Sequence, residues 1–152
     1  DSFYKGVAYV NPDIETTAVT TGDFSDTVKA REASLALVAQ GYDVLFACLD
    51  AAGAGVAAAA QDSENVMVVG SVADYAEDYG ASDVTVGSVV FAWDKLGYLE
   101  TLGELCDGRA HVLGMADEGI RPVINIELTE EQQAVYDAAL QALVDGEIDI
   151  AD

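Results

Sequence analysis

The sequence predicts an α/β fold, a three-layer α/β/α sandwich built around a mostly parallel sheet. Two short apolar runs, residues 44–48 and 66–69, have the length expected of strands that are buried on both faces. Segments with helical periodicity separate such runs at the spacing of parallel crossovers. The chain has 152 residues, of which 51% are hydrophobic. A chain of this length is enough for one domain with a hydrophobic core. The high hydrophobic fraction excludes a wholly disordered chain.

The first part of the chain predicts a helix, a strand and a second helix. Apolar residues recur at helical spacing over residues 3–10, and the Asn-Pro pair at 11–12 ends that helix. Residues 16–21 are rich in β-branched side chains, which predicts a strand. Ser25 is expected to cap the helix that follows, and Gly41 is expected to end it.

The middle of the chain continues the alternation of strands and helices. The strand at 44–48 leads into an Ala-rich helix over residues 53–61. The buried strand at 66–69 follows and is closed by Gly70. Residues 84–86 predict the next strand, so three parallel strands are expected in this region.

The last part of the chain departs from this rhythm. A helix is expected over about residues 91–106, followed by strands at 110–114 and 122–127, the second of which breaks the alternation. The Thr-Glu-Glu-Gln run at 129–132 is a capping box, which predicts the start of a helix that Gly146 ends.

The charge of the chain excludes several classes of partner. Six Lys and Arg stand against 28 Asp and Glu, a net charge of −22. A nucleic-acid binder needs a basic face, and an anionic membrane surface would repel this chain. No apolar run reaches the roughly 18 residues of a membrane span. Two interpretations of the acidity remain open, a solvated surface and adaptation to a saline medium.

Neither a metal centre nor a catalytic centre is predicted, and no cofactor is expected. The two cysteines, Cys48 and Cys106, could form one bridge, but a buried free thiol at each position is favoured. His111 is the one histidine of the sequence, which makes a zinc cluster improbable. Asp26 and Asp50 could pair as acid and base, yet carboxylates at strand ends also hold ligand amines or cap helices.

Candidate ligand-binding residues lie where the predicted strands end. In an open parallel sheet, ligands bind outside the carboxyl ends of the strands. Phe24, Asp26, Asp50 and Trp93 are expected at that edge. An aromatic beside an acid suits stacking on a flat ring while the acid accepts an N–H. The alternatives are that Phe24 plugs the space beneath the next helix and that Trp93 anchors its helix in the core.

Gly53 is the fifth candidate. The Gly-Ala-Gly run at 53–55, with Ala58 in the third position, resembles the Gly-x-Gly-x-x-Gly fingerprint of dinucleotide-binding proteins. No acidic residue follows at a clean strand end to hold a ribose. The alternative is a helix start made of small residues that packs closely on the sheet.

Several segments taken together resemble the basic membrane protein family, the PnrA-like substrate-binding lipoproteins of ABC transporters. The segments are Tyr9-Val10-Asn11-Pro12, Gly22-Asp23-Phe24-Ser25-Asp26 with Lys29 and Glu32, Gly41-Tyr42-Asp43-Val44-Leu45-Phe46, Gly70, Asp107-Gly108 and Asp145-Gly146-Glu147-Ile148. The resemblance covers nearly the whole chain in order. It implies a type I periplasmic-binding fold, in which two lobes hold the ligand in a cleft.

The resemblance also implies that the chain is a trimmed piece, about half of such a protein. Residues 1–109 correspond to the second lobe. Residues 110–152 correspond to the segment that returns to the first lobe, and here they are expected to pack on the same domain or on a partner chain. The missing first lobe, or a second copy of the chain, is therefore an expected partner.

For the ligand, the resemblance favours a purine base over a nucleoside. Nucleoside binders carry an Asp and a Lys that grip the ribose, and here Val72 and Phe91 stand in those positions. A branch of the family thought to bind purine bases is matched by Asp50, by Trp93 and loosely by residues 73–75.

The predicted function is therefore that of an extracytoplasmic, lipid-anchored solute-binding component of an ABC importer. It would bind a purine base or nucleoside-like molecule between two lobes and dock on a permease, and it would not be an enzyme. The alternatives are a cytosolic ligand-sensing regulator of the same fold and a nucleotide-dependent α/β enzyme.

Overall fold

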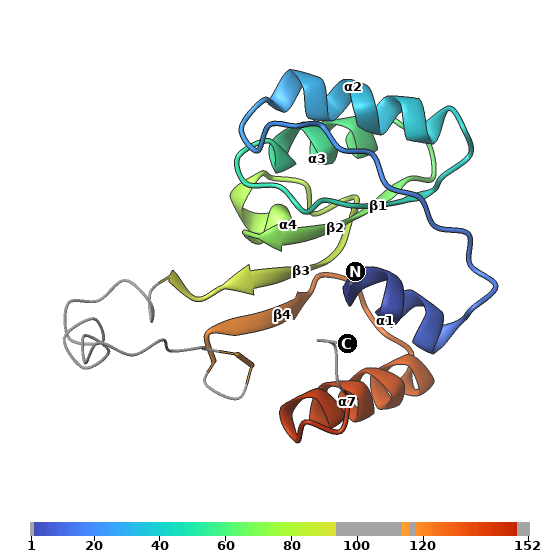
Figure 1. Ribbon diagram of the computed structural model, residues 1–152, viewed down its shortest axis with the longest axis vertical. Coiled ribbons are helices and arrows are strands. Elements are labelled where there is room, and N and C mark those ends of the chain that lie inside the picture. The colour runs from blue at the N-terminus through green and yellow to red at the C-terminus, as the bar shows by residue number, and fades with distance from the viewer. Residues whose placement is uncertain (1, 94–113, 116–117, 149–152) are drawn as a thin grey trace. The chain divides into compact units, whose positions relative to one another are not determined.

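The computed structural model describes residues 2–93, 114–115 and 118–148 (Figure 1). The chain divides into two compact units. The larger unit is Thr21–Glu127, and the smaller unit combines Asp1–Thr20 with Leu128–Asp152. The predicted division after residue 109 concerns the lobes of a longer protein and stays a prediction.

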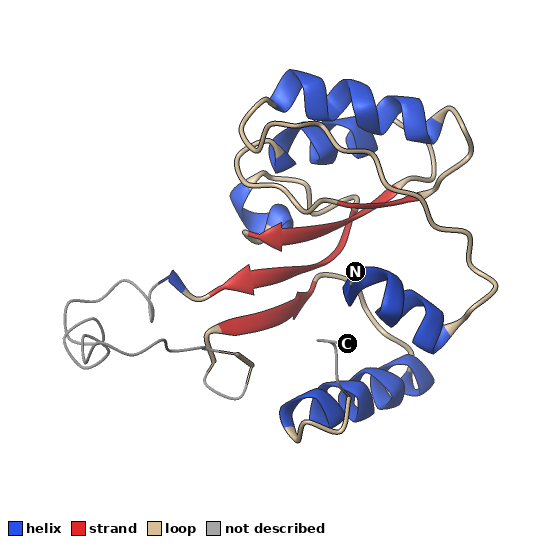
Figure 2. Ribbon diagram, in the orientation of Figure 1, coloured by secondary structure: helices blue, strands red, loops and turns tan. Residues whose placement is uncertain are grey.

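A four-stranded sheet forms the centre of the larger unit (Figure 2). Its strands are β1 (Val44–Phe46), β2 (Met67–Val72), β3 (Thr85–Phe91) and β4 (Ile120–Ile124), in that spatial order. The first three are parallel, and β4 pairs antiparallel with β3. The predicted α/β class with a mostly parallel sheet is confirmed, as is the strand that breaks the alternation.

Two strands extend beyond the ends that the sequence predicts. β2 continues through Gly70 to Val72, because Gly70 pairs with Ser88 of β3 and its missing side chain leaves room for the ring of Tyr75. β3 continues to Phe91, so the helix expected from about that residue begins two residues later, at Trp93. The rest of that predicted helix, the predicted strand at 110–114 and His111 lie outside the described residues, wholly or in large part.

The described residues of the larger unit include the helices α2 (Thr27–Val38), α3 (Gly53–Gln61) and α4 (Tyr75–Asp78). α2 packs on α3, α3 packs on β2, and α4 packs on β2 and β3. α3 has the predicted bounds. The cap of α2 is Asp26 and not Ser25, because the Asp26 carboxylate accepts the Lys29 N–H at 3.0 Å.

The predicted strand at residues 16–21 is wrong. The chain there is irregular, and the side chains of residues 16–20 are exposed. β-branched residues favour a strand only where a neighbouring strand pairs with it and one face is buried.

The smaller unit contains α1 (Ser2–Val10) and α7 (Glu130–Val144). Both were predicted, and the capping box of α7 is confirmed in both directions. Gln132 N–H donates to the Thr129 hydroxyl at 3.2 Å, and Thr129 N–H donates to the Gln132 side-chain oxygen at 2.9 Å. Neither helix has a buried residue. The described part of this unit therefore has no core of its own.

Tyr75 is the largest fully buried side chain of the described residues. Its backbone N–H donates to the Ser88 hydroxyl at 3.1 Å, and its ring lies 4.8 Å from that of Tyr79. Its own hydroxyl is buried and has no hydrogen-bond partner among the described residues. Burial and the nearby Tyr79 raise the pKa of Tyr75, so the hydroxyl stays protonated throughout the ordinary pH range.

Replacing Tyr75 with phenylalanine is expected to leave the free energy of unfolding unchanged or raise it by about 1 kcal/mol. The change removes an unsatisfied buried hydroxyl and keeps the ring. Tyr75→Ala is expected to cost about 3–5 kcal/mol, because it empties the space that the ring fills. Urea unfolding of both variants measures the two contributions. A loss of more than about 1 kcal/mol in Tyr75→Phe would show that the hydroxyl is satisfied after all.

Candidate functional site

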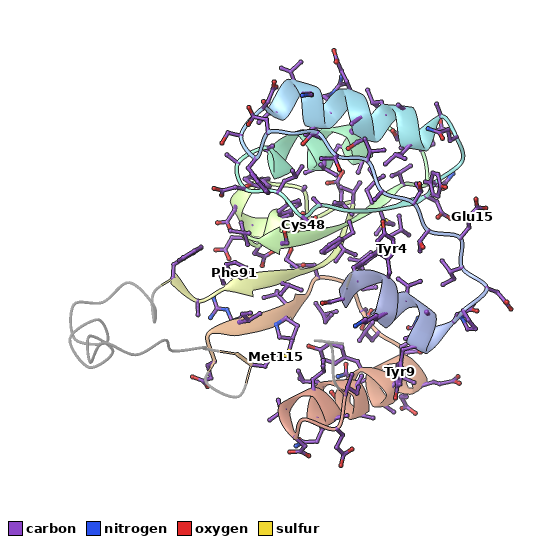
Figure 3. The ribbon with its side chains drawn as sticks, in the orientation of Figure 1. Tyr4, Tyr9, Glu15, Cys48, Phe91 and Met115 are labelled. Atoms are coloured by element: carbon purple, nitrogen blue, oxygen red, sulfur yellow. The ribbon has the colours of Figure 1, made fainter. Side chains whose placement is uncertain are left out.

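The five predicted site residues lie in the larger unit, in or next to the segments that connect its strands and helices. Phe24 lies in the loop before α2, and Asp26 begins that helix. Asp50 lies in the turn between β1 and α3, and Gly53 is the first residue of α3. Trp93 follows β3 by two residues. Figure 3 labels two residues beside them, Cys48 after β1 and Phe91 at the end of β3.

Phe24 presents its ring to solvent on a well-defined turn. The Asp23 carboxylate accepts the N–H groups of Ser25 at 2.7 Å and of Asp26 at 3.2 Å. The carbonyl of Phe24 accepts the N–H of Ala52 at 2.9 Å, which joins this loop to the turn between β1 and α3. The side chain is 66% exposed, so Phe24 is not a plug beneath α2.

Trp93 is also exposed, by 60%. Its ring packs edge-on against that of Phe91, with centroids 5.6 Å apart. The contact orients one face of the indole and leaves most of the ring accessible. Two exposed aromatic side chains are therefore available in the larger unit, Phe24 in the loop before α2 and Trp93 two residues after β3.

The two acidic candidates, Asp26 and Asp50, differ in the hydrogen bonds that their carboxylates make. Asp26 uses a carboxylate oxygen to cap α2. The side chain of Asp50 is exposed, while its backbone carbonyl accepts the N–H of Gly53 at 2.9 Å. Of the two carboxylates, that of Asp26 is already used in capping a helix, so Asp50 is the better candidate for a ligand contact. The ligand-binding roles of Phe24, Asp26, Asp50, Gly53 and Trp93 all stay predictions.

The first turn of α3 does not offer the donors of a dinucleotide site. The N–H groups of Gly53, Ala54 and Gly55 donate to carbonyls at residues 50–52, at 2.9, 3.3 and 2.9 Å. A phosphate at a helix start needs such groups free. Gly53 is instead required by packing, because a Cβ there would collide with the hydroxyl of Tyr75. The small residues are explained by close packing.

Three residues of this region were missed in the sequence. Asp23 shapes the Phe24 turn, and an Asp followed two and three residues later by Ser25 and Asp26 is a recognisable turn signal. Val72 has a φ of +74° at the end of β2, where a β-branched residue gives no hint of left-handed backbone. The burial of Tyr75 beneath Gly53 follows from tertiary packing alone.

Other chemistry is not indicated within the described part of the chain. Its His, Cys, Asp and Glu side chains form no group of three or more that could hold a metal ion. None of its helices is both long and apolar enough to cross a membrane. Cys48 is a free thiol, but it is exposed, so the prediction of burial is wrong for it; Cys106 lies outside the described residues.

Comparison with known proteins gives a consistent result over nearly the whole chain. Residues 1–151 match the family Bmp, described as ABC transporter substrate-binding protein PnrA-like. The Basic membrane protein D of Borreliella burgdorferi is 28% identical over 158 residues, which cover 97% of this chain and 46% of that protein. The chain thus spans about half the length of this curated relative.

Solved structures agree on the fold. A solute-binding protein of an ABC transporter system from Conexibacter woesei is 26% identical with a TM-score of 0.69, covering 95% of this chain and 49% of that one. A second from Aeropyrum pernix is 14% identical with a TM-score of 0.79, covering 97% and 51%. A transcriptional activator of the comK gene from Bacillus halodurans is 21% identical with a TM-score of 0.77, covering 96% and 52%. The last two show the fold alone.

Proposed function

Because this chain belongs to the Bmp family of PnrA-like ABC transporter substrate-binding proteins, we propose that it is one part of an extracytoplasmic solute-binding component. The whole protein would hold a small flat molecule, a purine base or a nucleoside-like compound, between two lobes and deliver it to an ABC permease. Closure of two lobes on a ligand is a recurrent mechanism of such proteins. In this proposal the full-length protein is anchored by a lipid and carries out no catalysis.

The observation that carries the proposal is the exposed ring of Phe24. A large apolar side chain is costly to leave in water, and this one sits on a turn fixed by hydrogen bonds at the carboxyl edge of the sheet. An aromatic face stacks on any flat ring, and Asp50 nearby in the fold offers an acceptor for a ring N–H. These features suit a neutral purine better than a phosphorylated compound, since the chain is strongly acidic.

The smaller unit supports the proposal that a partner lobe completes the protein. Helices α1 and α7 have no buried residue, although an amphipathic helix gains most of its stability from burying one face. The expected partner is the first lobe of the full-length protein, packed against residues 110–152, with a second copy of the chain as the alternative. Residues 1–109 would then form the second lobe.

A regulator of the same fold is the second candidate, because the Bacillus halodurans structure that this chain resembles is titled a transcriptional activator. The upstream sequence of the gene distinguishes the two. A signal peptide with a lipidated cysteine supports the transport component, and a DNA-binding segment supports the regulator. The nucleotide-dependent enzyme is disfavoured, because the backbone donors at the start of α3 are already used.

Titration of the full-length protein with adenine, guanine and adenosine tests the proposed ligand class. We expect one of the purines to bind, and Phe24→Ala to weaken that binding about 5- to 100-fold, the usual value of one aromatic stacked on a base. Phe24→Tyr is the matched control, since it keeps the ring, and it should bind within about threefold of the wild type. Calorimetry measures all three. No heat with any purine would reject the proposed ligand class.

A further inference from the structure

We infer that Asp23 is a positioning residue of the ligand site, holding the backbone of Phe24 so that its ring is presented in one orientation before the ligand arrives. The inference rests on the proposed function, because it gives Phe24 the role of stacking on the ligand. Asp23 itself does not touch the ligand in this scheme. It acts through the turn that it closes.

The geometry of the turn shows what Asp23 does. One carboxylate oxygen, Oδ1, accepts both the Ser25 N–H at 2.7 Å and the Asp26 N–H at 3.2 Å. The backbone carbonyl of Asp23 accepts the Thr21 hydroxyl at 3.0 Å. Both neighbours of Phe24 are therefore held by hydrogen bonds. Asp23 is held through its side chain and its carbonyl, and Ser25 is held through its N–H.

A second anchor acts on Phe24 directly. Its carbonyl accepts the Ala52 N–H at 2.9 Å, from the turn that leads into α3. The backbone of Phe24 is thus fixed from the side of α2 by Asp23 and from the side of α3 by Ala52. The ring that projects from this fixed backbone is 66% exposed.

The turn is not explained by the needs of α2. That helix has its own N-cap, because the Asp26 carboxylate accepts the Lys29 N–H. The bonds to Asp23 lie outside the helix and shape residues 23–26 only. Nor do they support the core, since residues 22–29 are exposed. The residue that this arrangement orders is Phe24.

Ordering a ligand-contacting side chain in advance raises affinity, because binding then costs less conformational entropy. The usual size of that cost corresponds to about a two- to tenfold change in the dissociation constant for one side chain. We therefore expect Asp23→Ala to weaken purine binding by about two- to tenfold. Asp23→Asn keeps an oxygen acceptor at the same position and should bind within about twofold of the wild type.

The experiment titrates full-length protein with the purine panel and compares Asp23→Ala, Asp23→Asn and Ser63→Ala. Ser63→Ala removes the hydroxyl that donates to the Ala59 carbonyl at 2.7 Å, at the far end of α3, so it controls for lost stability alone. It should lower the melting temperature and leave affinity unchanged. If Asp23→Ala binds as the wild type does, or if Asp23→Asn is as weak as Asp23→Ala, the inference is wrong.

A second readout needs no ligand. Phe24 is replaced by 4-fluorophenylalanine, and the transverse relaxation of its fluorine NMR signal is compared in the wild type, Asp23→Asn and Asp23→Ala. Slower relaxation in Asp23→Ala alone would show a ring released from its turn, and equal relaxation in all three would overturn the inference. This arm separates the two ideas: absence of purine binding by the wild type rejects the proposed function, while the fluorine signal still tests Asp23.

Discussion

Replacing Gly55 with alanine is expected to destabilise the larger unit by about 3 kcal/mol or more, a large part of the roughly 5–15 kcal/mol typical of a domain. Gly55 lies where α3 crosses α2, and a Cβ there would collide with the carbonyl oxygen of Thr27. The obstacle is backbone, and the N–H of Arg31 is close as well, so no side-chain rotation relieves it. The helices would have to separate and lose the packing between them.

Gly6→Ala is the matched control for that variant. Gly6 is also helical, in α1, but a Cβ there meets no atom within 4 Å. The change should be neutral or stabilise by up to about 1 kcal/mol, the difference in helix propensity. Urea unfolding followed by circular dichroism measures both variants. Equal stabilities would mean that α2 and α3 do not pack as closely as described.

The melting temperature is expected to rise by at least about 10 °C between about 0.1 M and 2 M KCl. The chain has 28 Asp and Glu but only six Lys and Arg, so at least 22 carboxylates have no Lys or Arg of their own to pair with. Even the ion pair between Arg31 and Asp62 is about half exposed, so it contributes little to stability. Repulsion among unpaired carboxylates acts over about 10 Å at 0.1 M salt and about 3 Å at 1 M, so salt should relieve it.

Charge-reduced variants separate screening from the general effect of concentrated solutes. Glu32→Gln, Glu64→Gln and Glu147→Gln change exposed carboxylates without altering side-chain size. The triple variant should melt higher than the wild type in low salt and respond less to KCl. Sucrose, which is excluded from protein surfaces, should stabilise both proteins equally. A salt response that is the same in both proteins would contradict the electrostatic explanation.

Much of the fold could be predicted where a short stretch of sequence contains its own physical reason. The apolar runs at 44–48 and 66–69 became β1 and β2, and the capping box at 129–132 became the start of α7. The stretch at 16–21 failed because its β-branched composition expresses a preference and cannot specify a pairing strand. A short stretch of sequence predicted an element correctly only where the interactions that stabilise the element lie within that stretch.

The site shows the same division. The place of Asp50 after β1 could be predicted, because the topology of a parallel sheet brings the strand ends to one edge. The place of Phe24 could not be predicted in this way, because the strand expected at 16–21 is absent and Phe24 is joined to the turn after β1 by a hydrogen bond to Ala52. The choice of Asp26 over Ser25 as the cap could not be predicted, because both residue types are favoured at that position. The left-handed backbone of Val72 could not be predicted either, because a β-branched residue rarely adopts a positive φ.

The packing of Tyr75 limits the order in which this region can evolve. The ring and hydroxyl occupy the space that side chains at Gly53 and Gly70 would need. A side chain gained first at either glycine meets the tyrosine, while a smaller residue gained first at position 75 opens a cavity. Either first substitution lowers stability, and the second regains stability that the first removed. The effects of substitutions at the three positions on the free energy of unfolding are therefore strongly non-additive. Diverging relatives are expected to change them together or keep all three.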